Sequence, residues 1–223
     1  MSEPAGRFAH SRRYDLAFAI PLAILFAFVC GGEVIGIARA LPGARGTIAF
    51  MSILNQAATL VFFAMQLVLC LTRRLPLRKS EGFWPQATAI LGANFNFALL
   101  RLPRVALSGV WTALSAVLTV GGTFAAIAVL LYLGRSFSIF PEGRGLVTRG
   151  PYRLARHPLY LAEIVSTLGI MLQFRQPWAA LIALVTIFFQ VRRMGYEEKI
   201  LLRTFPAYDA YRRVTARLIP GLY

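Results

Sequence analysis

The stretch VALSGVWTALSAVLTVGGTFAAIAVLLYL, residues 105–133, contains no Asp, Glu, Lys or Arg. A helix of about 20 apolar residues crosses the hydrocarbon core of a bilayer, so this run predicts a membrane-spanning helix. Five more apolar runs occur, at residues 16–37, 48–71, 87–100, 159–174 and 178–191. The sequence therefore predicts an all-α, polytopic integral membrane protein with about six transmembrane helices, the last two forming a short helical hairpin.

The composition of the whole chain agrees with a membrane protein. Of its 223 residues, 57% are hydrophobic and only 15% are charged, and the mean hydropathy is +0.62. A soluble globular domain carries about 25% charged residues. The net charge of +15 would suggest nucleic acid in a soluble protein, but here the basic residues lie between apolar runs. We therefore expect the lipid bilayer as a partner, and no nucleic acid.

The lysines and arginines predict which polar segments face the cytosol, where such residues accumulate. If all six runs cross and the N-terminus is cytosolic, the inside segments are 1–15, 72–86, 134–158 and 192–223. These segments hold 19 of the 24 basic residues, whereas leaving 87–100 out of the membrane reduces the best split to 14 against 10. We therefore expect six crossings, with both termini in the cytosol and the protein in a bacterial inner membrane.

The first apolar run could instead belong to a signal peptide, since Ala38-Arg39-Ala40 resembles a cleavage site. However, the run at 16–37 is longer than the usual signal-peptide core of about 7–15 residues, so we expect a retained helix. The two cysteines, Cys30 and Cys70, also lie inside apolar runs. We expect them to be small core residues, with no disulfide and no metal site.

The polar segment RSFSIFPEGRGLVTRGPYRLARHPLY, residues 135–160, differs from the rest of the chain. Its glycines and prolines interrupt any long helix and leave backbone amides available to a ligand. Pro158 suits the first turn of a helix, where its missing N–H is not needed, so His157 should lie at a helix start. The alternative is an ordinary cytosolic loop whose arginines contact lipid phosphates.

A second polar element follows the last apolar run. Pro177 can begin a helix that continues past Val191 into the cytosol, with Gln190, Arg193 and Glu197 on one face. Arg193 and Glu197 can form an ion pair within this helix, which would be a purely structural role. Glu198 lies on a different face.

Four short motifs occur in order: Leu146-Val147-Thr148-x-Gly150-Pro151-Tyr152, Arg156-His157-Pro158-x-Tyr160, Glu197-Glu198 and Phe205-x-x-Tyr208-x-x-Tyr211. This ordered set, within residues 134–220, resembles the isoprenylcysteine carboxyl methyltransferase family and its phospholipid-methylating relatives. The resemblance implies two parts, with N-terminal transmembrane helices in 1–133. Residues 134–223 would then form a methyltransferase-like loop, a helical hairpin and a C-terminal cytosolic helix.

The resemblance further implies that the cofactor S-adenosyl-L-methionine binds in a cytosolic pocket. The matching positions that would line this pocket are Arg144, Gly145, Leu146, Val147, Tyr152, His157, Pro158, Leu159, Tyr160 and Glu197. Arg193 would be the catalytic residue that faces the acceptor, a lipophilic small molecule or a lipid-modified molecule. A carboxylate acceptor, as in isoprenylcysteine carboxyl O-methylation, needs no general base, whereas an amine or thiol would need one, such as Glu197 or Glu198.

Three other functions remain open at this point. A phospholipid or amine methyltransferase would use the same cofactor. The segment 156–163 is similar to a histidine-containing motif of sterol-reductase-like, NADPH-dependent membrane enzymes, but has Leu159 where those enzymes tend to have asparagine. A non-enzymatic transporter or scaffold is favoured only by Glu33, because a carboxylate within a membrane span is a candidate for function.

Overall fold

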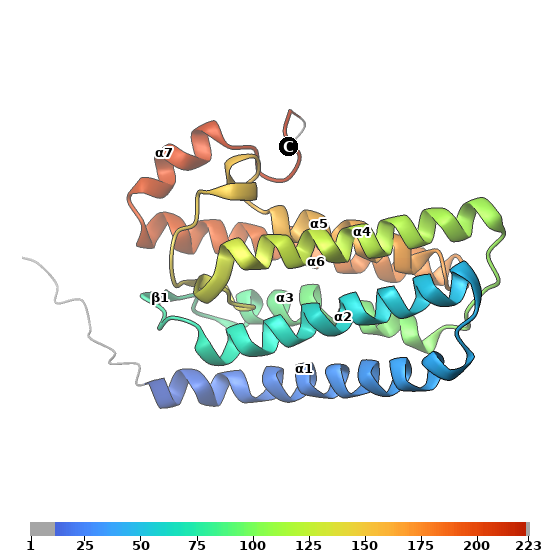
Figure 1. Cartoon of the computed structure of the whole chain (residues 1–223). Coiled ribbons are helices and arrows are strands. Elements are labelled where there is room, and N and C mark those ends of the chain that lie inside the picture. The colour runs from blue at the N-terminus through green and yellow to red at the C-terminus, as the bar shows by residue number, and fades with distance from the viewer. Residues whose placement is uncertain (1–11, 222–223) are drawn as a thin grey trace, which may run out of the picture.

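The structure is a computed structural model, and it describes residues 12–221 (Figure 1). Both chain ends, residues 1–11 and 222–223, were predicted to be cytosolic and lie outside the described residues. The described part has seven α-helices: α1 (Arg12–Ala40), α2 (Gly46–Thr72), α3 (Phe83–Asn94), α4 (Gly109–Leu133), α5 (Pro158–Met171), α6 (Trp178–Thr204) and α7 (Ala207–Val214). It also has four 3₁₀ helices, η1 (Leu41–Gly43), η2 (Phe95–Arg101), η3 (Gly134–Ser136) and η4 (Gly150–Arg153), and two short strands, β1 (Arg78–Lys79) and β2 (Glu142–Gly143).

Four helical stretches are long and apolar enough to cross a membrane: Ala19–Gly43, Ala49–Thr72, Gly109–Ser136 and Trp178–Thr204. An all-α fold with several candidate membrane-spanning helices is therefore confirmed. The predicted short hairpin differs in one respect, because α5 is short, with 14 residues, but α6 has 27. Helix α6 begins directly after Pro177, as predicted, and its backbone hydrogen bonding continues through the polar residues beyond the apolar run.

The apolar run at 87–100 is not one helix. Helix α3 ends at Asn94, whose side-chain amide donates to the carbonyl of Ile90 at 2.9 Å, and η2 follows at once. Such side-chain bonds compete with regular helix pairing. At about 1.5 Å per α-helical residue and 2.0 Å per 3₁₀ residue, the two pieces together extend about 32 Å. This length is comparable to the roughly 30 Å of a bilayer's hydrocarbon core.

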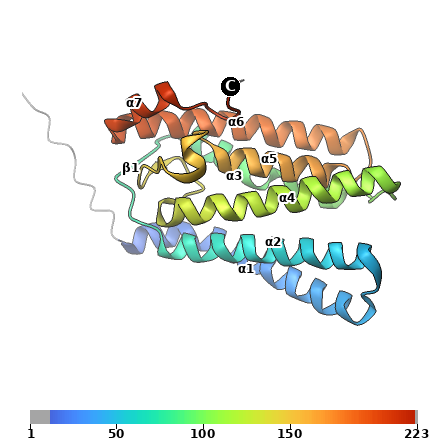
Figure 2. The ribbon, with the colours of Figure 1, turned by 45° about the horizontal axis from the view of Figure 1, so that its top comes forward.

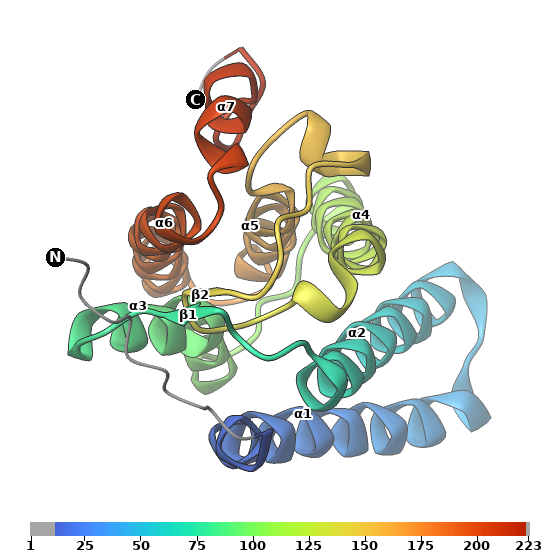
Figure 3. The same cartoon turned by 90° about the vertical axis from the view of Figure 1, so that its left-hand side faces the viewer.

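The polar segments gather at one end of the bundle, here called the motif end. There β1 pairs antiparallel with β2, which joins the segment after α2 to the segment after α4 (Figure 3). At the opposite, distal end, the backbones of Arg104 and Phe174 form an isolated antiparallel β-bridge. The backbone N–H of Arg175 also donates to the carbonyl of Pro103 at 3.1 Å. Among residues 12–221, the segments that the basic residues assigned to the inside therefore share one end, and those assigned to the outside share the other (Figure 1).

Helices α4 and α5 pack closely through small residues. A β-carbon added at Gly122 would lie 2.5 Å from the backbone nitrogen of Ser166, and one at Gly169 would lie 2.5 Å from that of Thr119. The hydroxyl of Ser115 also donates to the carbonyl of Gly169 at 2.8 Å. Small residues allow such backbone approach in membrane helices, where packing and hydrogen bonds replace the hydrophobic effect between helices.

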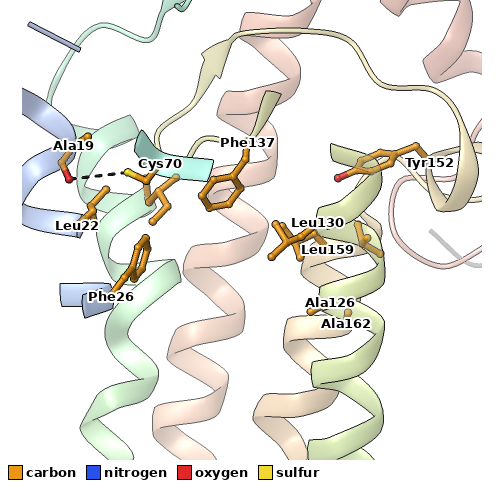
Figure 4. Packing of buried hydrophobic residues seen from close by; sticks show 13 residues of the cluster. Ala19, Leu22, Phe26, Cys70, Ala126, Leu130, Phe137, Tyr152, Leu159 and Ala162 are labelled. Atoms are coloured by element: carbon orange, nitrogen blue, oxygen red, sulfur yellow. Dashed lines mark hydrogen bonds between the residues drawn. The ribbon is translucent and has the colours of Figure 1, made fainter. Parts of the chain in front are cut away.

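The outer layer consists of α1 and α2, with α2 packed on α4 and α3 packed on α6 (Figure 2). One buried cluster connects these layers, and Phe137 from the segment after α4 is part of it. Figure 4 shows Phe137 between Leu22, Phe26 and Cys70 on one side and Leu130 and Leu159 on the other. The polar segment is thus anchored in the core of the bundle.

Candidate functional site

A cavity of about 380 Å³ extends from the motif end into the bundle, and its lining includes residues from all seven α-helices. Nine of the eleven predicted site residues line it: Arg193, Gly145, Leu146, Val147, Tyr152, His157, Leu159, Tyr160 and Glu197. Arg144 and Pro158 do not. The structure therefore brings most of the predicted residues together around one space.

His157 connects the start of α5 to α6. It is the residue before Pro158, which begins α5 as predicted, and its side chain is buried. The imidazole Nε2 lies 3.1 Å from Oε1 of Glu198, and Nδ1 lies 3.9 Å from Oε2 of Glu197. Two adjacent carboxylates on different faces of α6 therefore reach the same ring, which sequence spacing did not indicate for Glu198.

Glu198 also has two arginine partners that come from outside α6. Its Oε1 lies 3.3 Å from Nη1 of Arg156 and 3.4 Å from Nε of Arg217. Arg217 follows α7, and the backbone N–H of His157 donates to its carbonyl at 3.1 Å. These contacts hold the C-terminal tail against the start of α5.

Arg193 lies at the centre of the site and is only 5% exposed. Its guanidinium carbon is 4.9 Å from the centre of the Tyr160 ring, and Nη2 donates to the carbonyl of Ser138 at 3.1 Å. Its Nε lies 3.2 Å from Oε1 of Glu197, which also accepts a hydrogen bond from the Tyr160 hydroxyl. The ion pair within α6 is therefore present. The same contacts hold the guanidinium over an aromatic ring, a stabilising cation–π contact.

Glu163, one turn after Tyr160 on α5, also lines the cavity and was not among the predicted residues. Its Oε2 accepts a hydrogen bond at 3.1 Å from Nε2 of Gln190, which lies on the Arg193 face of α6. A carboxylate within an apolar helix is by default a candidate for function. This signal was present in the sequence and could have identified Glu163.

Two tyrosines of α7 close the motif end of the cavity. The hydroxyl of Tyr211 donates to the carbonyl of Tyr152 in η4 at 2.5 Å. Burial raises the pKa of Tyr211 to about 12, so this hydroxyl keeps the proton that it donates. Tyr208 is fully buried beside it. The Phe205-x-x-Tyr208-x-x-Tyr211 motif therefore packs against the Gly150-Pro151-Tyr152 end of the first motif.

Arg144 belongs to a buried network of charges next to the cavity. Its Nη2 lies 2.6 Å from Oδ1 of Asp15 in α1 and 2.6 Å from Oε2 of Glu142. Nε of Arg73 and Nζ of Lys79 also reach Asp15, at 3.1 and 3.6 Å. Burial acts to raise the pKa of Asp15, but the hydrogen bond and charge of Arg144, with Arg73 and Lys79, hold it below its usual value.

Residues 104–207 match the phospholipid methyltransferase family. This part of the chain is a domain of the phospholipid methyltransferase family. The resemblance found in the motifs is thereby confirmed. The domain contains all eleven predicted site residues, while Asp15, Glu33, Asn55, Tyr208 and Tyr211 lie outside it.

Three curated proteins show similarity to part of the chain. It is 34% identical over 113 residues to the nickel-cobalt-cadmium resistance protein NccN of Alcaligenes xylosoxydans xylosoxydans, covering 48% of this chain and 52% of that protein. It is 34% identical over 84 residues to protein-S-isoprenylcysteine O-methyltransferase A of Arabidopsis thaliana, covering 35% and 43%. It is 33% identical over 78 residues to the cobalt-zinc-cadmium resistance protein CzcN of Cupriavidus metallidurans, covering 34% and 36%. The chain thus matches about half the length of the first relative and less of the other two. Within residues 12–221, no group of three or more His, Cys, Asp or Glu side chains is arranged to hold a metal ion.

Proposed function

We propose that the protein is an integral membrane, S-adenosylmethionine-dependent methyltransferase that acts on the carboxylate of a lipophilic acceptor, as in isoprenylcysteine carboxyl O-methylation. One observation carries the proposal. The residues of the methyltransferase motifs line one end of a cavity that continues between the apolar helices. A cytosolic cofactor and a lipidic acceptor would therefore meet inside a single space.

The residues at the motif end fit the cofactor. The cavity volume of about 380 Å³ lies in the range of small-molecule sites, roughly 300–1,000 Å³. The Glu197 carboxylate can accept hydrogen bonds from ribose hydroxyls or pair with an ammonium group, and the backbone of Gly145–Val147 can bind adenine or a carboxylate. When bound, S-adenosylmethionine supplies a methyl group on a sulfonium sulfur. Arg144 and Pro158 do not line the cavity and would position the residues that do. Arg144 would hold the loop after α4 through Asp15 and Glu142, and Pro158 would begin α5.

Arg193 would bind and orient the acceptor carboxylate. A guanidinium can bind both oxygens of a carboxylate at once, and this one is already fixed by Tyr160 and Ser138. A carboxylate needs no proton removed before it attacks a methyl group, so the protein's contribution is alignment and the exclusion of water. Buried aromatic residues such as Phe137 and Tyr152 serve the second purpose.

Radiolabelled methyl transfer would test the proposal. The purified protein in lipid nanodiscs is incubated with labelled S-adenosylmethionine and a membrane lipid extract, and the products are extracted into organic solvent. We expect a lipophilic methyl ester, which releases its label as methanol on treatment with base. Absence of any labelled product with extracts from several sources, despite measured cofactor binding, would contradict the proposal.

Methylation of an amine, as on a phospholipid headgroup, is the second candidate, and Glu163 favours it. An amine that is protonated at neutral pH must lose a proton before its nitrogen lone pair can attack the methyl group, and a carboxylate in the cavity next to the Arg193 face of α6 could accept that proton. An N-methyl product resists base, so the same assay separates the two acceptors.

We also propose that the protein crosses a bacterial inner membrane six times and that its motif end faces the cytosol. The combined length of α3 and η2 and the sorting of polar segments to the two ends support this topology. Single cysteines in place of Glu81, near the motif end, and Arg101, at the distal end, would be tested for labelling by an impermeant reagent. Cys30 and Cys70 would first be replaced by alanine. Labelling of both positions from the same side would contradict six crossings.

A further inference from the structure

The cavity is not purely apolar where it approaches the distal end. Glu33 of α1, Asn55 of α2 and Asn96 of η2 all contribute to its lining. Counted from the distal ends of their helices, at about 1.5 Å per α-helical and 2.0 Å per 3₁₀ residue, they lie about 10, 14 and 10 Å deep. The three side chains therefore sit at a similar depth, and we call them the distal subsite.

The distal subsite presents oxygen acceptors that lack donors. Within residues 12–221, Glu33 has no hydrogen bond or ion pair, and Oδ1 of Asn55 and Oδ1 of Asn96 are buried without a hydrogen-bond partner. Leaving such groups unpaired inside a membrane protein costs free energy, which a ligand with N–H donors would recover. A carboxylate among them favours a cationic donor.

Between the distal subsite and Arg193, the part of the cavity wall that α1 contributes is apolar. Phe26 and Val29 lie on the same face of α1 as Glu33, one to two turns nearer the motif end, and both line the cavity. Arg193 is about 22 Å from the distal end of α6 by the same count, so it lies about 12 Å beyond Glu33 along the bundle. A ligand that reaches both would therefore be polar at each end and would present an apolar middle part to Phe26 and Val29.

We propose that the distal subsite binds the ammonium end of an elongated acceptor whose carboxylate is held by Arg193. The inference rests on the proposed function for the role of Arg193, but the subsite itself is defined by Glu33, Asn55 and Asn96. The class of acceptor is an amphipathic carboxylate with a primary amine at the far end of an aliphatic chain. A plain hydrocarbon tail would leave all three acceptor groups unpaired.

A matched pair of probes tests this proposal by binding alone. The purified protein in nanodiscs is titrated with a series of ω-amino fatty acids and with unsubstituted fatty acids of the same chain lengths. A charge-assisted hydrogen bond is worth roughly ten- to hundredfold in affinity, so we expect the amino compound of the best length to bind at least about tenfold more tightly. Equal affinities at every length in the wild-type protein would overturn the proposal, and this comparison needs no variant.

Two substitutions locate the preference. Glu33→Gln should abolish the preference for the amino compound and leave the affinity for the plain fatty acid unchanged. Glu81→Gln, which removes an exposed carboxylate at the motif end, is the matched control and should retain the preference. A preference that survives Glu33→Gln would also overturn the proposal. Cofactor binding and methyl transfer are measured separately, so loss of those activities with the preference intact would contradict only the proposed function.

Discussion

Removing the Arg144 side chain should destabilise the fold strongly. The Arg144 side chain is 0% exposed, and its partners Asp15 and Glu142 are 4% and 7% exposed. In Arg144→Met, an apolar side chain of similar length would replace the guanidinium and leave two buried carboxylates without their closest cation. Breaking a buried ion pair in this way costs about 3–5 kcal/mol of unfolding free energy. Arg149→Met, at an exposed position of the same segment, is the control and should change stability by less than about 0.5 kcal/mol.

The pH dependence of stability follows from Asp15. The pKa of its carboxyl is lower in the folded protein than the ordinary value of 3.8, mainly because Arg144, Arg73 and Lys79 outweigh the effect of burial. A carboxyl with a lowered pKa contributes stability above its unfolded pKa and loses that contribution as the pH falls through its folded pKa. Wild-type stability should therefore fall below about pH 4, and Asp15→Asn should reduce this acid dependence.

The assay is SDS titration of the protein in mixed micelles, followed by tryptophan fluorescence, together with cofactor titration of each variant. Because Asp15 and Arg144 are in contact, the double variant should lose less stability than the sum of the two single variants. The reasoning would be refuted if Arg144→Met unfolded within about 0.5 kcal/mol of wild type while losing cofactor affinity. That result would instead support the direct cofactor contact that the family resemblance implied.

Three further predictions concern the site and the helix packing. Glu197→Gln should weaken S-adenosylmethionine binding roughly ten- to hundredfold in calorimetry, with Glu81→Gln unaffected; an unchanged affinity would reduce Glu197 to a structural partner of Arg193. Arg193→Lys should raise the acceptor KM or lower turnover, because lysine cannot lie flat over Tyr160, while donor affinity stays within about threefold; wild-type kinetics would remove Arg193 from the site. Gly122→Ala should cost about 1–3 kcal/mol through overpacking against α5, whereas Gly121→Ala meets open space; equal melting temperatures would disprove the close packing.

The parts of the structure that depend on near neighbours were predictable from the sequence. Pro158 and Pro177 each precede or begin a helix where their chemistry indicated, and glycines and prolines interrupt the polar segment. Long charge-free runs likewise form the long helices. Such features arise from backbone geometry and from the cost of placing polar groups in lipid, both of which local sequence encodes.

The parts that depend on distant partners were not predictable. Arg144 meets Asp15, which lies 129 positions earlier in the chain, so its matching motif position alone suggested a cofactor contact. Glu198 reaches His157 because the C-terminal part of α6 packs beside the start of α5, which helical spacing on one element cannot show. The division of the 87–100 run into α3 and η2 follows from a side-chain bond of Asn94 that hydropathy does not register.

The pairing of β1 with β2 has a consequence for chimeric proteins built from relatives. The family domain begins at residue 104, but β2 lies inside it and is paired with β1, which lies outside it. Grafting the domain alone onto foreign N-terminal helices would transplant the first three motifs and still leave one strand edge unpaired and Arg144 without Asp15. A successful exchange must therefore carry across the short Arg78–Lys79 strand and an acidic residue equivalent to Asp15. With those two features kept, together with the packing of α2 on α4 and of α3 on α6, other positions of the first three helices can diverge, and with them the shape of the cavity.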